Sequence, residues 1–289
     1  MAVQPGIALS ETARFPYEKW GPQLPVLSRI YRENAPFPHI QLQQFVDPEI
    51  ALAAAEEFPR SDTPAWIQYK HQNENKQGMP KRERFPRLLG ELTDELNSPE
   101  FCRWLSELTG IRNLLSDASL EGGGLHQSSR GGFLNVHTDF SKHHYHKHWR
   151  RRVNLVLYLN EGWREEWGGS IELWDASMRH CVARYAPILN HAVIFTTDEG
   201  SLHGFPDPLR CPPGESRKSI ALYYYTEERD EHAAPHSTDY RARPEDSIGK
   251  ACLIWLDKKA VDLYSRAKAR FGFSDEMASR ILGFLSSKK

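Results

Sequence analysis

The feature that most constrains the fold is a succession of short apolar segments that begins near residue 117 and ends near residue 228. Glycine and turn-forming residues separate these segments. Many short strands spaced by turn signals are typical of an all-β barrel or a jelly roll. The segments that we expect to form strands are 118–127, 132–138, 152–160, 169–174, 180–185, 191–196, 201–204 and 217–226. We therefore expect a mainly β core over residues 117–228, flanked by helices.

Residues 1–116 are expected to form a helical and irregular region that packs on this core. Residues 1–36 are rich in proline and glycine, which predicts a loosely structured lead-in. The polar stretch 60–84 predicts an excursion or a flexible flap. The regular elements that we expect here are a strand at 37–42 and helices at 50–58, 86–97 and 99–109.

Residues 229–289 follow the core and are expected to be a charged linker with a helical extension. The extension contains two segments with helical signals, near 251–270 and 275–286. Ser274 is a suitable N-cap for the second of them.

Composition excludes several classes of protein. The chain has 289 residues, of which 39% are hydrophobic and 26% charged, so it is expected to be a soluble globular protein. Its formal net charge is −1, and no nucleic-acid partner or membrane span is expected. The first residues lack the pattern of a signal peptide, and the four cysteines lie far apart in the sequence. Reduced thiols in a cytoplasmic protein are the simplest interpretation.

The chemistry is expected to centre on the segment 133–140, which reads Phe-Leu-Asn-Val-His-Thr-Asp-Phe. Along a strand, residues two apart point to the same face, so His137 and Asp139 should project side by side. Alone, such a pair is a weak signal. With one more histidine from a distant strand, the set becomes two imidazoles and one carboxylate on one face of a metal. This arrangement leaves other coordination positions open, as a non-haem Fe(II) oxygenase requires.

The third ligand should come from a strand late in the barrel, and His203 is our choice. It lies just after the apolar segment 192–196, in the sequence Gly-Ser-Leu-His-Gly. The main rivals are His191, at a turn, and His126, on the strand before the His-x-Asp pair.

Arg217 and Ser219 open the last strand of the core and should share its inward face. A buried arginine needs an anionic partner, and its planar guanidinium suits a carboxylate held by two hydrogen bonds. No acidic residue nearby in the sequence is an obvious partner. We therefore expect Arg217 to receive the distal carboxylate of a dicarboxylic co-substrate, with Ser219 as an added donor. The alternative is an arginine at the end of the barrel, paired with a surface glutamate.

These elements resemble the prolyl 4-hydroxylase-like branch of the Fe(II)/2-oxoglutarate dioxygenases, over about residues 118–228. The resemblance rests on His137-x-Asp139, segment 153–160, the Trp-Gly-Gly-Ser-Ile-Glu-Leu segment 167–173, His203 and Arg217-x-Ser219, in that order. It implies a double-stranded β-helix (a jelly roll of two facing sheets) and iron held by His137, Asp139 and His203. It also implies that Tyr158 hydrogen-bonds the 2-oxoglutarate carboxylate bound by Arg217. One departure is an insert at 206–214, which makes Lys218 a rival of Arg217, although alternation and Ser219 favour Arg217.

The resemblance implies an enzyme that consumes 2-oxoglutarate and O2, releases succinate and CO2, and hydroxylates an unactivated C–H bond. Fe(II) is the implied cofactor, and ascorbate is a candidate reductant. Peptidyl proline, an amino acid and a sugar or lipid intermediate all remain open as substrates, and so does the oligomeric state. Two competing hypotheses are a cupin-like zinc or manganese isomerase or hydrolase, and a catalytically silent jelly-roll binding module. Neither needs a buried carboxylate clamp, so Arg217, Ser219 and Tyr158 argue against both.

The basic and histidine-rich run 142–152 follows Asp139 directly. Such a run is usually a solvated loop. It can instead present a cationic rim to an anionic substrate.

Overall fold

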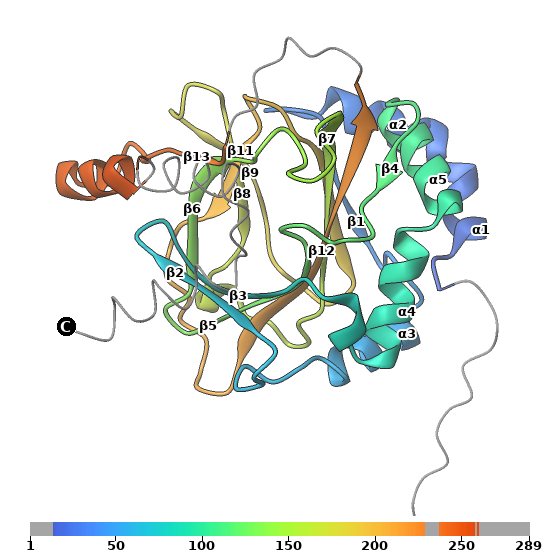
Figure 1. The fold of residues 1–289 in the computed structure, drawn as a ribbon, viewed down its shortest axis with the longest axis horizontal. Coiled ribbons are helices and arrows are strands. Elements are labelled where there is room, and N and C mark those ends of the chain that lie inside the picture. The colour runs from blue at the N-terminus through green and yellow to red at the C-terminus, as the bar shows by residue number, and fades with distance from the viewer. Residues whose placement is uncertain (1–13, 229–236, 258, 260–289) are drawn as a thin grey trace, which may run out of the picture.

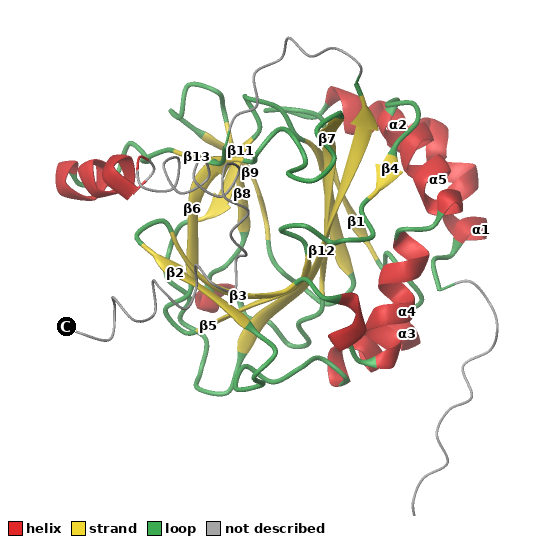
Figure 2. Ribbon diagram, viewed as in Figure 1, coloured by secondary structure: helices red, strands yellow, loops and turns green. Residues whose placement is uncertain are grey.

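The computed structural model describes residues 14–228, 237–257 and 259 of the chain. Within them, antiparallel strands form a single curved sheet that folds back on itself (Figures 1 and 2). The sheet order is β1-β10-β7-β12-β5-β3-β6-β11-β8-β9, with β2 on β3, β4 on β12 and β13 on β6. The fold is thus mainly β with flanking helices and has a barrel-like jelly-roll core, as expected.

The strands of this sheet are short, apart from β7 and β12. In chain order they are β1 (His39–Gln43), β2 (Ile67–His71), β3 (Glu74–Met79), β4 (Leu115–Ser116), β5 (Gly124–Ser129), β6 (Phe133–Thr138), β7 (Trp149–Tyr158), β8 (Ile171–Trp174), β9 (Cys181–Tyr185), β10 (His191–Thr196), β11 (Leu202–Phe205), β12 (Ser216–Glu227) and β13 (Asp239–Tyr240). Those from β5 to β12 overlap the segments expected from the sequence.

The helices lie mostly before the core in sequence. They are α1 (Tyr17–Trp20), α2 (Leu24–Glu33), α3 (Pro48–Glu56), α4 (Arg87–Leu96) and α5 (Pro99–Thr109), with 3-10 turns η1 (Gly21–Gln23), η2 (Arg82–Arg84) and η3 (Glu165–Trp167). The start of α5 is stabilised by Ser98, whose hydroxyl accepts a bond from the Phe101 amide at 3.1 Å. Gly110, with φ of 75°, ends it in the left-handed region. No helix of the described residues is long and apolar enough to cross a membrane.

Helices α1 to α5 cover one face of the β1-β10-β7-β12 part of the sheet, opposite the interior of the jelly roll (Figure 2). Leucines of α4 and α5 join one buried cluster with Leu155 and Leu157 of β7 and Ile220 and Leu222 of β12. Tyr224 reaches across from β12, and its hydroxyl donates to the Leu96 carbonyl at 2.7 Å. One face of β7 and β12 is therefore committed to packing, and the other face is left for the cavity.

Two parts of the chain differ from the sequence-based expectation, and a third is described only in part. The lead-in 1–36 contains α1 and α2, because Pro25 stands in the first turn of α2, where its missing N–H costs nothing. The expected flap 60–84 contains the β2–β3 hairpin instead, and β3 pairs with both β5 and β6. Beyond the core, residues 248–257 are helical and overlap the segment expected at 251–270. The greater part of that segment and the helix expected at 275–286 lie outside the described residues.

Candidate active site

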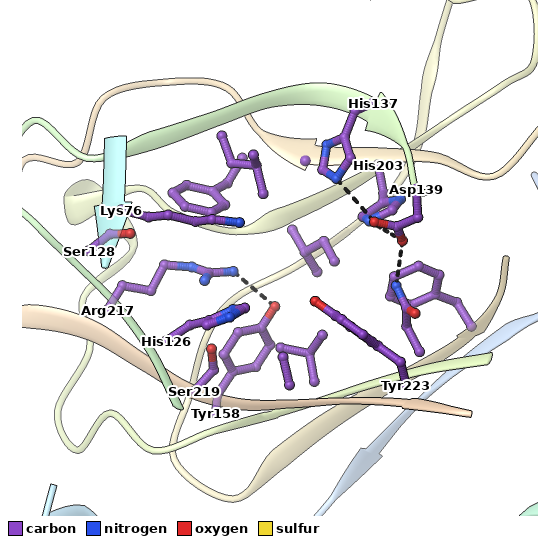
Figure 3. A pocket seen from close by; sticks show the side chains of 18 of the residues that line it. Lys76, His126, Ser128, His137, Asp139, Tyr158, His203, Arg217, Ser219 and Tyr223 are labelled. Atoms are coloured by element: carbon purple, nitrogen blue, oxygen red, sulfur yellow. Dashed lines mark hydrogen bonds and ion pairs between the residues drawn. The ribbon is translucent and has the colours of Figure 1, made fainter. Parts of the chain in front are cut away.

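The two halves of the jelly roll enclose a pocket that is lined by side chains from both (Figure 3). The lining comes mainly from β3, β5, β6, β7, β11 and β12. Its polar and charged members are Lys76, His126, Gln127, Ser128, His137, Asp139, Arg151, Asn154, Tyr158, His203, Arg217, Ser219 and Tyr223. The pocket thus contains all six residues that the sequence singled out.

His137, Asp139 and His203 meet on one wall of this pocket. His203 on β11 is directly opposite His137 on β6 in the antiparallel register, and Asp139 follows β6. The Nε2 atom of His137 is 3.6 Å from Oδ1 of Asp139, and Nε2 of His203 is 3.5 Å from Oδ2. One ligand atom from each of the three residues lies within 4.8 Å of the others. This spacing can hold one metal ion.

Backbone hydrogen bonds determine which nitrogen each histidine presents to the pocket. Nδ1 of His137 donates to the Asn135 carbonyl, and Nδ1 of His203 donates to the Ser201 carbonyl, both at 2.9 Å. A carbonyl only accepts, so the proton of the neutral ring is on Nδ1 and the lone pair is on Nε2. Burial lowers the pKa of His203 to about 4, which keeps this imidazole neutral. Each ring therefore presents its Nε2 atom, which can bind a metal, to the space between the three residues.

Asp139 is held by two residues that the sequence analysis did not assign to the site, Arg151 and Asn154. Asn154 donates from Nδ2 to Oδ2 of Asp139 at 2.7 Å, and Nη2 of Arg151 lies 3.1 Å from the same oxygen. Nε of Arg151 donates to Oδ1 of Asn154 at 2.8 Å, so Arg151, Asn154 and Asp139 each contact the other two. Burial alone would raise the pKa of Asp139, but the Arg151 charge and the two histidines hold it well below its usual range. The carboxylate is therefore ionised and fixed in orientation.

The guanidinium of Arg151 is buried between two aromatic rings. Its Cζ atom is 3.3 Å from the ring centroid of Tyr223 and 4.7 Å from that of Phe140. Strict alternation would place Arg151 and Asn154 on opposite faces of β7. The register with β12 shifts between Arg151 and Val153, so Arg152 is an extra residue and both side chains point inward.

Arg217 and Tyr158 form a second group, on the opposite side of the pocket from the triad (Figure 3). Nη2 of Arg217 donates to the Tyr158 hydroxyl at 3.0 Å, and Nε donates to the Gly169 carbonyl at 2.7 Å. Among the described residues, Arg217 forms no ion pair with a carboxylate, so the predicted alternative of a surface glutamate partner finds no support there. The guanidinium keeps unused N–H groups, and the tyrosine keeps its own proton to donate.

Ser219 and Lys218 lie on opposite faces of β12, as alternation predicts. Ser219 is buried in the lining of the pocket and pairs with Tyr158 in the register. Lys218 is absent from the lining, and its backbone N–H donates to Oδ1 of Asn160 at 2.6 Å. The structure thus brings Arg217, Ser219 and Tyr158 together around the pocket and leaves Lys218 outside it.

The two rival histidines do not join the triad. His126 lines the pocket from β5, and burial together with the nearby Lys76 charge lowers its pKa to about 3. His191 begins β10, outside the lining, and its Nδ1 lies 3.4 Å from Nε2 of Gln41. Neither residue belongs to the group of potential ligands formed by the described residues.

The run 142–152 is neither a plain solvated loop nor a plain cationic rim. His143 is buried, with its two ring nitrogens each 3.3 Å from a carboxylate oxygen of Asp117 or Glu121. Arg150 and Arg152 pair with Glu228 at 3.5 and 3.1 Å. The buried member of the basic triplet, Arg151, is the one that reaches Asp139.

The jelly roll thus has a possible metal-binding His-Asp-His group on one wall and, facing it, an arginine that has no carboxylate partner among the described residues. Residues 123–225 match the family model of the 2OG-Fe(II) oxygenase superfamily. A comparison with curated protein sequences gives no match. The predicted resemblance is confirmed over this core, which is similar to the 2OG-Fe(II) oxygenases in sequence pattern.

Solved structures of similar fold include three prolyl hydroxylases. One, from Trichoplax adhaerens in complex with a hypoxia inducible factor peptide, is 15% identical, with a TM-score of 0.52 over 72% of this chain and 91% of that one. Another, from Phytophthora capsici, is 19% identical, with a TM-score of 0.51 over 79% and 70%. The third, from Pseudomonas putida, is 20% identical, with a TM-score of 0.48 over 71% and 100%. At these identities the likeness to the first two is one of fold.

Proposed function

We propose that this protein is a non-haem Fe(II)- and 2-oxoglutarate-dependent dioxygenase that hydroxylates an unactivated C–H bond and releases succinate and CO2. The observation that carries the proposal is the buried Arg217, which has no carboxylate partner among the described residues and faces the same pocket as the triad. A buried guanidinium without an anion is costly unless a ligand supplies one. A dicarboxylate that also reaches the metal would do so.

The donor set fits Fe(II). Two neutral imidazole nitrogens and one ionised carboxylate are the facial group of non-haem iron oxygenases, and they leave coordination positions for a co-substrate and O2. His137, Asp139 and His203 would hold the ion. The bound iron would supply the oxidative decarboxylation of 2-oxoglutarate and the oxidation of the C–H bond.

The protein's own side chains would orient these partners. Arg217, with Tyr158 and Ser219, would bind the distal carboxylate of 2-oxoglutarate. Burial raises the pKa of the Tyr158 hydroxyl, which therefore stays protonated as a donor. Arg151 and Asn154 both contact Oδ2 of Asp139 and would keep this carboxylate ionised and oriented toward the metal. Apolar side chains such as Val156, Ile171 and Phe195 line the rest of the pocket and would exclude water.

Three classes of substrate are candidates. The structures of similar fold are described as prolyl hydroxylases, and one of them holds a peptide, so a peptidyl proline is a candidate here. A free or carrier-bound amino acid and a sugar or lipid intermediate are the others. Ascorbate is a candidate reductant, and a cytoplasmic location without nucleic-acid partners stays a prediction. A zinc or manganese isomerase, or a silent binding module, would leave Arg217 without a role.

The test is to bind Fe(II) and then 2-oxoglutarate without oxygen, and to follow succinate release after oxygen is admitted. We expect saturable binding of 2-oxoglutarate that depends on the metal, and a slow release of succinate that a true substrate accelerates. The matched control is His203→Ala, which should bind neither Fe(II) nor 2-oxoglutarate in a metal-dependent way. Tight binding of Zn²⁺ with no binding of 2-oxoglutarate would contradict the proposal and favour the isomerase or hydrolase class.

A further inference from the structure

Lys76 is a charged residue in the pocket that neither the triad nor the carboxylate clamp uses. It lies on β3, where this strand leaves its pairing with β5 at Gln77 and takes up pairing with β6 at Asn75. Its side chain reaches into the pocket from β3, with the ammonium toward the centre (Figure 3). The signal for this residue was weak in the sequence, since β3 is polar along most of its length.

A chain of ion pairs holds the Lys76 ammonium in place from behind. Nζ of Lys76 is 3.0 Å from Oε2 of Glu74, and Oε1 of Glu74 is 2.9 Å from Nε2 of His71. Nδ1 of His71 is in turn 2.7 Å from Oδ2 of Asp257. The chain therefore runs from the helical segment 248–257, through the β2–β3 hairpin, to the pocket.

The charges along this chain alternate, and formally they cancel. Burial would lower the pKa of His71, but its bonds to Asp257 and Glu74 raise it to about 9, so the ring is cationic at neutral pH. Glu74 contacts two cations, His71 and Lys76, and Asp257 supplies the second carboxylate to His71. An ammonium has three donors, and Glu74 takes one from Lys76, which leaves donors for the pocket.

The charge balance of the loaded pocket favours an anionic substrate. The lining contains three fixed cations, Lys76, Arg151 and Arg217, and one carboxylate, Asp139. A divalent metal and a dianionic 2-oxoglutarate cancel each other, and Arg151 cancels Asp139. The charge of Glu74 offsets that of Lys76. The charge of Arg217 is then the one positive charge that this count leaves without a counter-charge. A buried site with a surplus charge is stabilised by a ligand of the opposite sign.

We propose that Lys76 forms an anion-binding subsite for a carboxylate or phosphate group of the primary substrate. This inference rests on the proposed function and narrows its substrate class to small anionic molecules. An internal prolyl residue of a peptide carries no such group, so this substrate class differs from a peptidyl proline. His126, which is neutral beside Lys76, offers a further polar contact in the same part of the pocket.

The experiment uses isothermal titration calorimetry on the full chain loaded anaerobically with Fe(II) and 2-oxoglutarate. The probes are sodium acetate and inorganic phosphate, titrated at constant ionic strength against chloride. The variants are Lys76→Met, Lys76→Arg and the double variant Glu74→Gln/Lys76→Met, which removes both members of the ion pair. Lys218→Met is the matched control, because it removes the same charge from the same sheet outside the pocket.

We expect one of the two anions to bind saturably to the wild type, which distinguishes a carboxylate subsite from a phosphate subsite. Its affinity should fall at least about tenfold in Lys76→Met and in the double variant. Lys76→Arg should retain most of it, and Lys218→Met should match the wild type. Affinity for 2-oxoglutarate should stay within about twofold of the wild type in every Lys76 variant.

Three results would overturn the inference. They are no saturable binding of either anion to the wild type, equal binding in Lys76→Met, and a loss of 2-oxoglutarate affinity in Lys76→Met as large as that in Arg217→Met. The last would make Lys76 part of the co-substrate clamp. If the wild type binds no 2-oxoglutarate, the proposed function fails, and titrating acetate and phosphate into the Fe(II) protein alone still decides whether Lys76 binds anions.

Discussion

The pocket contains two buried arginines whose surroundings differ in one decisive way. Arg151 has an ionised carboxylate at 3.1 Å and an amide at 2.8 Å, and it is packed between two rings. Arg217 has a neutral hydroxyl and a backbone carbonyl as hydrogen-bond partners. Both side chains are similarly buried, so burial does not separate their roles. What separates them is whether the anion is supplied by the protein or must come with a ligand.

This difference supports the proposal that Arg151 orients Asp139, whereas Arg217 binds an anionic ligand. Burial lowers the pKa of Arg217, and Tyr158 opposes that effect only in part. The pKa of Arg151 is raised, because the Asp139 charge outweighs the effect of its burial. A pocket arginine without its counter-ion is therefore a more specific sign of an anionic ligand than a basic residue alone.

The largest effect should come from the triad, which Arg151 contacts through Asp139 and Arg217 does not. His203→Ala should weaken Fe(II) binding by more than about a hundredfold. The loss of a metal ligand costs more affinity than the loss of a residue that hydrogen-bonds a ligand. The measurement is anaerobic metal titration, with circular dichroism to verify folding. His126→Ala is the matched control and should retain metal binding. If instead His126→Ala lost the metal and His203→Ala kept it, the identity of the third ligand would be wrong.

Arg217→Met should weaken 2-oxoglutarate binding by about thirty- to a thousandfold, or about 2–4 kcal/mol, since it removes a charge-assisted bond from a desolvated pocket. Fe(II) affinity without co-substrate should change little. Arg217→Lys keeps the charge but loses the planar guanidinium, so its affinity for 2-oxoglutarate should lie between those of the wild type and Arg217→Met. Lys218→Met serves as the control in the same anaerobic titration. A large loss in Lys218→Met with normal binding in Arg217→Met would contradict the assignment.

Tyr158→Phe removes one neutral donor to a charged acceptor, so it should weaken 2-oxoglutarate binding by about 1.5–3 kcal/mol. The same change also removes a hydrogen-bond partner of Arg217. We therefore expect the effects of Tyr158→Phe and Arg217→Met to be less than additive in the double variant. Additive losses would show that the two side chains bind different groups.

Arg151→Met should weaken Fe(II) binding by about ten- to a hundredfold and leave intrinsic 2-oxoglutarate recognition nearly unchanged. The reason is that Asp139 loses the charge that depresses its pKa. A depressed carboxylate pKa favours the folded, ionised form above the unfolded pKa, and this advantage is lost as pH falls through the folded value. In Arg151→Met the folded pKa rises, so metal release on acidification should begin at a higher pH. Metal titrations between neutral and acidic pH would measure this, and an unchanged profile would contradict the positioning role.

The smallest effect should come from Arg150 and Arg152, which pair with Glu228 at the end of β12. Partly exposed pairs of this kind contribute about 0–1 kcal/mol. Arg150→Gln and Arg152→Gln should therefore change the free energy of unfolding by less than about 1 kcal/mol and leave both Fe(II) and 2-oxoglutarate affinities unaltered. Denaturant unfolding and the same anaerobic titrations would test this. A loss of metal affinity comparable to that of Arg151→Met would show that the whole basic run acts on the site.

The sequence by itself predicted the core of this protein because the relevant signals are local. The His137-x-Asp139 pair and Arg217-x-Ser219 depend on the two-residue period of a strand, which needs no tertiary information. The apolar segment 192–196 places a buried strand just before His203, and β10 and β11 lie there. The turn chemistry between short strands predicted the jelly roll for the same reason.

Only the tertiary structure revealed that Arg151, Asn154 and Lys76 belong to the pocket. A bulge in β7 turns Arg151 and Asn154 to one face, and no local period predicts where a bulge falls. The polar hairpin of β2 and β3 is a pair of strands because it docks on β5 and β6, and that docking brings Lys76 into the pocket. Propensity and periodicity describe a segment on its own, whereas these contacts depend on neighbours far away in the sequence.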